Sequence, residues 1–313
     1  MKIGSADFRV VLIGSSGLLG RAISSELAER TRWQVVQTAY RHVDAESVEL
    51  DIRDEEAVRS FIAGQKPDAI VVAAAERRPD ICENDPSLAR ALNVDALSFI
   101  GAVANEIGAW VLSISTDYVF DGTRPPYHPD DEPKPLNAYG RSKLEGERAL
   151  MRSMDRSCVL RLPLLYGPVT DWSESAVTSL APAIAKSAVD SVAVSMDGWA
   201  TRYPTFTPDV AIVIRQLLER YESGTPVNGV VHWSGDEPMT KFDIATCIAR
   251  VLRVDAKFHC QNEPMDATPR PKDCHLASTA LNDMHIGRRT PFETGIQAVL
   301  KRWPQPTITR QTA

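Results

Sequence analysis

Two hydrophobic patterns alternate along the first half of the chain. Short runs that are apolar throughout indicate strands buried on both faces of a sheet. The predicted strands are 8–14, 33–40, 47–52, 67–75, 109–115 and 157–167. The intervening segments place apolar residues every three or four positions and predict helices at 18–30, 54–65, 86–108 and from about Tyr139. Strands that alternate with helices predict an α/β fold with a Rossmann-type, doubly wound parallel sheet.

The sequence pattern changes after Gly167, where prolines, aromatic residues and loops become more frequent. We interpret residues 1–166 as the sheet domain and 167–303 as mainly a smaller C-terminal α/β lobe. Segments at about 205–232 carry a clear helix and strand pattern and are expected to return to the sheet domain. The last ten residues, 304–313, form a tail that is too polar to contribute to a hydrophobic core.

Composition narrows the class of protein. The chain has 313 residues, 43% hydrophobic and 24% charged, with a net charge of −6, which is typical of a soluble globular protein and argues against nucleic-acid binding. No signal peptide is recognisable and no stretch approaches a membrane span. The five scattered cysteines and six histidines show no metal-ligand spacing, so we expect no metal and a reducing, cytoplasmic location.

A glycine turn follows the first predicted strand. Gly14, Gly17 and Gly20 lie in "GSSGLLG", between this strand and the helix after it. Such a turn lets backbone N–H groups approach a pyrophosphate at a helix N-terminus. The spacing is G-x-x-G-x-x-G and not the usual G-x-G-x-x-G, and glycines also simply end strands. The strand–turn–helix context nevertheless favours nucleotide binding.

The end of the second strand indicates which dinucleotide binds. An NAD site usually carries an acid there, whereas this chain has Tyr40, Arg41 and His42. An arginine suits a 2′-phosphate, so NADP(H) is favoured, although Arg41 is also interpretable as a solvated surface residue. Asp51, after the third strand, is a candidate ligand of the adenine amino group or else the N-cap of the following helix.

Polar side chains then gather where ligands bind parallel sheets. Ser115 and Thr116 end a buried strand, and Tyr139 and Lys143 are one turn apart on the next predicted helix. A Tyr-x-x-x-Lys pair alone is common by chance and is equally a surface pair. With a strand-end hydroxyl and the glycine turn, it indicates a phenol that gives a proton to a substrate oxygen.

These motifs resemble the extended short-chain dehydrogenase/reductases. More narrowly, "STDYVFDG" (115–122, from Ser115) and "PLNAYGRSKLEGE" (135–147) resemble the dTDP-4-dehydrorhamnose reductase family, with similarity from the glycine turn to "GRRTPFETGI" (287–296). The resemblance implies that Thr116 binds the substrate carbonyl, with Ser115 as the fallback, and that Tyr139 donates the proton. It also implies that Lys143 binds the nicotinamide ribose and lowers the pKa of Tyr139.

The same resemblance implies a cofactor site on further residues. Ser16, Gly17, Leu18 and Leu19 would face the pyrophosphate. Ala73 and Arg77 would line the cofactor after the fourth strand, and Leu165 would approach the nicotinamide. The alternative interpretation of each of these residues is that its side chain only packs in the core or is solvated at the surface.

Other segments resemble one branch of the family, the regulatory β subunit of methionine adenosyltransferase. They include "AAERRPDICE" (74–83), "LRLPLLYGPV" (160–169) and "MDGWATRYPT" (196–205). The last segment departs from the sugar-nucleotide reductases at Trp199 and Arg202. Arg202 and Arg270 are candidate anion ligands and Trp199 a candidate stacking residue, whereas a structural ion pair and core packing are the alternatives.

Two functions therefore remain open. The first is an NADPH-dependent reductase acting on a small molecule, a nucleotide-activated 4-keto-6-deoxysugar. The second is a non-catalytic subunit that binds NADP(H) and docks on the catalytic subunit of methionine adenosyltransferase, for which the polar tail is a candidate contact. A homodimer is compatible with either. The intact Thr116, Tyr139 and Lys143 favour the reductase.

Overall fold

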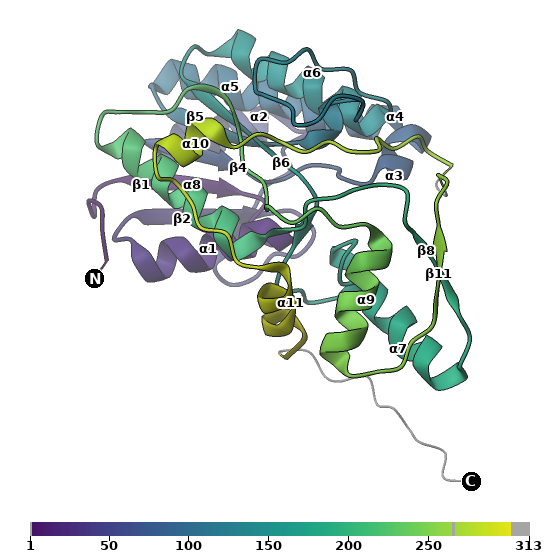
Figure 1. Cartoon of the computed structure of the whole chain (residues 1–313). Coiled ribbons are helices and arrows are strands. Elements are labelled where there is room, and N and C mark those ends of the chain that lie inside the picture. The colour runs from purple at the N-terminus through teal and green to yellow at the C-terminus, as the bar shows by residue number, and fades with distance from the viewer. Residues whose placement is uncertain (1, 265–266, 302–313) are drawn as a thin grey trace.

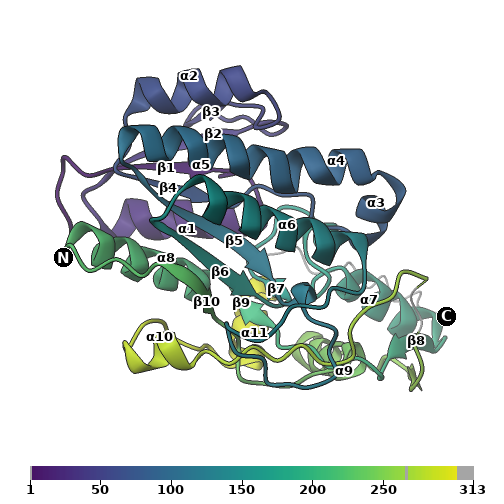
Figure 2. The same cartoon turned by 90° about the horizontal axis from the view of Figure 1, so that it is seen from above.

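The computed structural model describes residues 2–264 and 267–301. The predicted polar tail, 304–313, lies outside the described residues. Seven parallel strands form the main sheet in the order β10-β6-β5-β4-β1-β2-β3 (Figures 1 and 2). This sheet confirms the predicted doubly wound α/β fold. The strands are β1 (Arg9–Ile13), β2 (Gln34–Ala39), β3 (Ser47–Glu49), β4 (Ala69–Val72), β5 (Trp110–Thr116), β6 (Ser157–Leu162) and β10 (Gly229–His232).

Helices cover both faces of this sheet (Figure 2). On one face, α1 (Leu18–Arg30) packs beside α8 (Thr207–Glu222), and their apolar sides share a core with β1, β4, β5 and β6. On the other face lie α2 (Glu55–Gln65), α5 (Ala96–Ile107) and α6 (Ala138–Ser153). Because both faces are covered, the strands need continuous apolar sequence, as in the fully buried "AIVV" of β4.

The stretch expected to be one helix at 86–108 has three parts. It comprises α4 (Pro86–Arg90), a π-helical turn (Ala91–Asp95) and α5, preceded by the short α3 (Pro79–Asn84). By length and composition 86–107 is the one described helical stretch that could cross a membrane, contrary to the prediction that none approaches a span. Half of its most apolar window is buried inside the fold, and core helices of soluble proteins pass the same test.

A second group of elements packs around its own apolar core below the sheet (Figure 1). Tyr166, Met196, Ile248 and Phe292 are among its buried members. The elements are α7 (Leu180–Asp190), β8 (Val194–Asp197), α9 (Lys241–Leu252), β11 (Phe258–Gln261) and α11 (Phe292–Lys301). β8 pairs with β11, and β7 (Leu165–Tyr166) pairs with β9 (Thr205–Phe206). The small α10 (Thr279–Asp283) packs near β10.

The segment 205–232 lies partly with the sheet domain. β10 extends the sheet beside β6, and α8 packs on α1. The division into two lobes at residue 166 stays a prediction, because the two cores meet where β7 pairs with β9. This arrangement places residues from both parts around the carboxyl ends of the strands.

Candidate functional site

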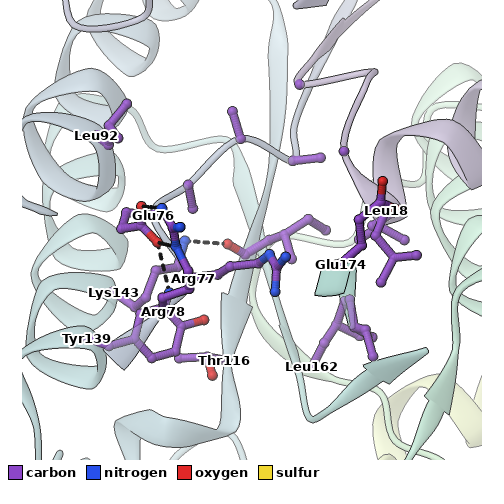
Figure 3. A pocket seen from close by; sticks show the side chains of 18 of the residues that line it. Leu18, Glu76, Arg77, Arg78, Leu92, Thr116, Tyr139, Lys143, Leu162 and Glu174 are labelled. Atoms are coloured by element: carbon purple, nitrogen blue, oxygen red, sulfur yellow. Dashed lines mark hydrogen bonds and ion pairs between the residues drawn. The ribbon is translucent and has the colours of Figure 1, made fainter. Parts of the chain in front are cut away.

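A cavity of about 900 Å³ lies at the carboxyl ends of β1, β4 and β5 (Figure 3). Most of the residues predicted for the site line it. They are Gly14, Ser16, Gly17, Leu18, Leu19, Tyr40, Arg41, His42, Asp51, Ala73, Arg77, Ser115, Thr116, Tyr139, Lys143, Leu165, Arg202 and Arg270. Gly20 and Trp199 are not among the lining residues.

The glycine turn brings the start of α1 to this cavity. Gly14 has φ +87°, and a Cβ there would meet the backbone N of Ala74 at 2.8 Å. A Cβ on Gly20 would meet the carbonyl oxygen of Gly14 at 2.1 Å. Gly20 therefore permits the close packing of α1 on the turn and does not face a ligand. Gly17 caps α1 with no side-chain hydrogen bond, and the first turn holds no acid. The helix N-terminus is thus suited to an anion.

At the ends of β2 and β3, a second arginine joins the predicted one. Arg41 is exposed on the cavity wall. Arg53, which sequence reasoning missed, donates to both carboxylate oxygens of Asp51 and, at 3.0 Å, to the hydroxyl of Tyr40. Its guanidinium lies 5.1 Å from the Tyr40 ring centroid. The hydrogen bond from Arg53 lowers the pKa of Asp51, so Asp51 is ionised and held by a neighbour two residues away.

The alternative interpretation of Asp51 as a helix N-cap is wrong. Asp54 caps α2, and its Oδ1 accepts from the backbone N of Ala57 at 3.0 Å. Asp51 instead stays on the cavity wall.

The loop after β4 is fixed by a residue of the π-helical turn. Asn93, 1% exposed, accepts from the backbone N of Glu76 and donates to its carbonyl oxygen, both at 2.9 Å. It also donates to Ser142 Oγ at 3.0 Å, and Ser142 lies on the helix that carries Tyr139. Glu76 in turn forms an ion pair with Arg78 at 2.6 Å, and Arg77 and Arg78 are both exposed (Figure 3). Asn93 and Glu76 were missed, because nothing in their local sequence marks them.

Thr116, Tyr139 and Lys143 come together at one side of the cavity (Figure 3). Asn137 caps α6 by accepting from the backbone N of Gly140 at 2.9 Å, so the helix starts just before Tyr139. Lys143 follows one turn later, is 4% exposed, and donates from Nζ to the carbonyl oxygen of Ile114 at 2.8 Å. The helix therefore holds the phenol and the amine beside the end of β5.

The protonation of this pair differs from the sequence-based prediction. Burial raises the pKa of the Tyr139 phenol, and a hydrogen bond with Thr116 opposes this only in part. Burial also lowers the pKa of Lys143 to about 8, while Glu147 opposes the change. The predicted lowering of the Tyr139 pKa by Lys143 is therefore wrong in direction for this structure, because desolvation dominates. A neutral phenol is the form that can donate a proton.

The hydroxyl of Ser115, the predicted fallback, donates to another group in this structure. Its Oγ donates to Glu147, which also forms an ion pair with Arg161 at 2.7 Å. Both side chains of the ion pair are 3% exposed. Ser115 thus lines the cavity while its hydroxyl belongs to a buried network, and Thr116 is the hydroxyl beside Tyr139.

The cavity wall near Tyr118 carries positive charge from the C-terminal half. Arg202 is 7% exposed, donates to the carbonyl oxygen of Pro271 at 3.0 Å, and stands 5.8 Å over the ring of Tyr118. Arg270 lies 3.6 Å from Asp80. Both arginines line the cavity, as expected of anion ligands. Trp199 does not line it, and its backbone N–H donates to Asp197 Oδ1. Among the described residues, no group of His, Cys, Asp or Glu is placed to hold a metal ion.

Comparisons with known proteins agree with this geometry. The sequence model of the RmlD substrate binding domain matches residues 8–304. Methionine adenosyltransferase 2 subunit beta of Xenopus laevis is 42% identical over 305 residues, which cover 95% of this chain and 90% of that protein. A dTDP-4-dehydrorhamnose reductase of Aggregatibacter actinomycetemcomitans is 32% identical over 243 residues, covering 77% and 78%.

A solved structure shows the same fold. It is the dTDP-4-dehydrorhamnose reductase of Bacillus anthracis in complex with NADP, with a TM-score of 0.80 and 23% identity. The match covers 97% of this chain and 100% of that one. The resemblance inferred from sequence motifs, including its regulatory-subunit branch, is thereby confirmed.

Proposed function

The chain belongs to the RmlD substrate binding domain family, and from this premise we propose that it is an NADPH-dependent reductase of a keto group on a nucleotide-activated deoxysugar. One observation carries the proposal. The cavity brings together Thr116, Tyr139 and Lys143. It also receives the uncapped N-terminus of α1 and two arginines of the C-terminal half, Arg202 and Arg270.

The residues present fit the cofactor. Ser16 to Leu19 would hold the pyrophosphate at the start of α1, where backbone N–H groups lack a side-chain cap. Arg41 and Arg53 would face the 2′-phosphate, and Lys143 the nicotinamide ribose. A similar fold is known in complex with NADP. When bound, the reduced nicotinamide supplies the hydride.

The protein's own side chains supply the proton, the charge stabilisation and the substrate binding. Tyr139 donates its phenolic proton to the carbonyl oxygen of the substrate as that oxygen becomes negative. Lys143 places a positive charge one helical turn from the phenol and stabilises the phenolate that remains. Arg202 and Arg270 attract the anionic part of the substrate, and the lobe formed by residues from 167 onward thereby contributes substrate binding. The five free thiols support a reducing compartment such as the cytoplasm.

Turnover tests the proposal directly. Purified protein mixed with NADPH and dTDP-4-dehydrorhamnose should lose absorbance at the wavelength of the reduced nicotinamide. Protein that binds NADPH, measured by its fluorescence, but consumes none with this sugar or related keto sugars would contradict the reductase proposal.

A second function is favoured by one observation, the 42% identity to a regulatory β subunit against 32% to a reductase. In this alternative the chain binds NADP(H) without turnover and docks on a methionine adenosyltransferase catalytic subunit. Mixing the two purified proteins should then give a complex on size-exclusion chromatography that is weakened by deletion of 304–313. Absence of a complex at micromolar concentration would count against this alternative.

Arg41→Ala is expected to weaken NADPH binding by about tenfold and NADH binding by less than twofold, because only NADPH carries the 2′-phosphate. Titration of both dinucleotides by fluorescence measures the effect. Arg32→Ala, which also removes an exposed arginine but lies off the cavity wall, is the control. An equal loss for both cofactors would remove Arg41 from the 2′-phosphate site.

A further inference from the structure

Asp117 is a buried carboxyl group that the mechanism above does not use. It follows Thr116 directly, is 6% exposed, and lines the cavity. The Oγ1 of Thr116 donates to its Oδ1 at 3.1 Å. Burial raises the pKa of Asp117 to about 7, although the nearby Arg202 opposes this. A buried acid in direct contact with the site hydroxyl therefore exists in both protonation states near neutral pH.

The hydrogen bonds around Thr116 form a chain with a direction. Its hydroxyl has a single proton, which goes to Asp117 when that group is a carboxylate. It accepts from the backbone N of Tyr118 at 3.2 Å. Its hydrogen bond with Tyr139 lowers the pKa of the phenol, which is the effect of a donor to the phenol oxygen. While Asp117 is a carboxylate, the Thr116 proton is directed to Asp117 and away from the Tyr139 oxygen.

Protonation of Asp117 reverses the chain. A carboxylic acid donates its own proton to Thr116, so the Thr116 hydroxyl no longer needs to donate to Asp117. The Thr116 proton is then available to the phenol oxygen of Tyr139 or to the substrate oxygen. A donor to the phenol oxygen stabilises the phenolate that forms when Tyr139 gives up its proton, so this direction favours carbonyl reduction.

We propose that Asp117 is a positioning residue that sets whether the Thr116 hydroxyl points toward Asp117 or toward the Tyr139 oxygen and the substrate. The inference deepens the proposed reductase function and rests on it for its effect on turnover. The hydrogen-bond coupling between Asp117 and Tyr139 does not depend on turnover and can be measured separately.

Titratable groups from several elements face Asp117 and are electrostatically coupled to it. Tyr139 comes from α6, Tyr118 from the 3-10 turn Asp117–Val119 that also holds Asp117, and Cys274 from the loop before α10. The cation is Arg202, whose hydrogen bonds to the carbonyl oxygens of Thr201 and Pro271 keep it in place. An anionic substrate that neutralises Arg202 would remove the charge that favours the carboxylate. Substrate binding would thereby shift Asp117 toward the neutral, reducing-competent form.

The pH profile of turnover tests the proposal. Asp117 is neutral below its pKa, so activity is highest at low pH and falls as Asp117 ionises. Between about pH 6 and about pH 7.5, kcat/KM of the wild type, which reports the unbound protein, should fall about fourfold, and kcat/KM of Asp117→Asn by less than twofold, because an amide does not titrate. Asp130→Asn, the same change at an exposed loop position, should keep the wild-type fall. A fall of equal size in Asp117→Asn would overturn the proposal.

A turnover-independent measurement covers the case in which no substrate is reduced. The ring carbon that bears the Tyr139 hydroxyl, labelled with ¹³C and assigned with Tyr139→Phe, should change its chemical shift with a midpoint near the Asp117 pKa of about 7. Thr116→Val should abolish this response, because the valine cannot relay the hydrogen bond. Lack of turnover with a normal response would overturn only the reductase proposal. Lack of the response in folded wild-type protein would overturn the role of Asp117.

Discussion

Tyr139→Phe is expected to bind NADPH as tightly as the wild type and to lose reduction by a factor of about 10² to 10⁴. The phenol is the neutral, half-buried group at the substrate side of the cavity, and desolvation raises its pKa, so it holds its proton until the carbonyl oxygen becomes negative. Phenylalanine keeps the ring, which packs edge-on against Tyr118 at 5.9 Å, and removes only the hydroxyl.

The measurement separates chemistry from binding. NADPH affinity is followed by fluorescence, and kcat by absorbance loss with a saturating keto sugar. Tyr221→Phe removes a hydroxyl from a ring stacked on Trp110, remote from the cavity, and should leave both quantities unchanged. Turnover of Tyr139→Phe within twofold of the wild type would exclude Tyr139 as the proton donor.

Glu147→Ala is expected to lower the free energy of unfolding by about 3–5 kcal/mol. Glu147 accepts from Arg161 through both carboxylate oxygens, at 3.0 Å and 2.7 Å, and from Ser115. Register places Ser115, Arg161 and His232 side by side on three neighbouring strands, all buried. Burial and Arg161 lower the pKa of His232 to about 3, so the histidine is neutral and cannot compensate for a lost charge.

Removal of the carboxylate therefore leaves the Arg161 guanidinium buried without its anion. Urea denaturation followed by circular dichroism measures the change. Glu145→Ala, on the same helix, is the matched control, because Glu145 is 55% exposed and its contact with Arg90 is 3.7 Å long. We expect it to cost about 0–1 kcal/mol. If the two variants were equally stable, the buried network would not contribute to stability.

The sheet and the cofactor side of the site were predictable from local patterns. β1 and β4 lie within the predicted apolar runs, β5 ends one residue beyond its run, and α1 begins at Leu18 as the periodicity indicated. The turn between β1 and α1 needs glycine for steric reasons, and parallel strands end at a common edge. From these local signals, Gly14, Thr116 and Tyr139 are predicted to line one cavity.

Local patterns failed where contacts distant in sequence decide the conformation. The stretch 86–108 is helical by periodicity, but Asn93 sits in a π-helical turn, where its amide holds the loop at Glu76. The carbonyl oxygen of Asn93 also approaches Gly146 so closely that a Cβ there would lie 1.9 Å from it. Similarly, β8 and β11 pair across about sixty residues of sequence, and three of the four residues of β11 are exposed, so no apolar run marks that strand.

The sequence by itself determined the alternation of strands and helices, the glycine turn and the placing of Tyr139 one turn from Lys143, because each depends on residues at most a few positions apart. Only the tertiary structure decided the protonation of that pair, since burial of Tyr139 and Lys143 depends on elements that come from the whole chain. It also decided that Ser115 serves the buried network and that Asp117 contacts Thr116 beside Arg202. Desolvation and hydrogen-bond direction are properties of packed surroundings, which no short stretch of sequence contains.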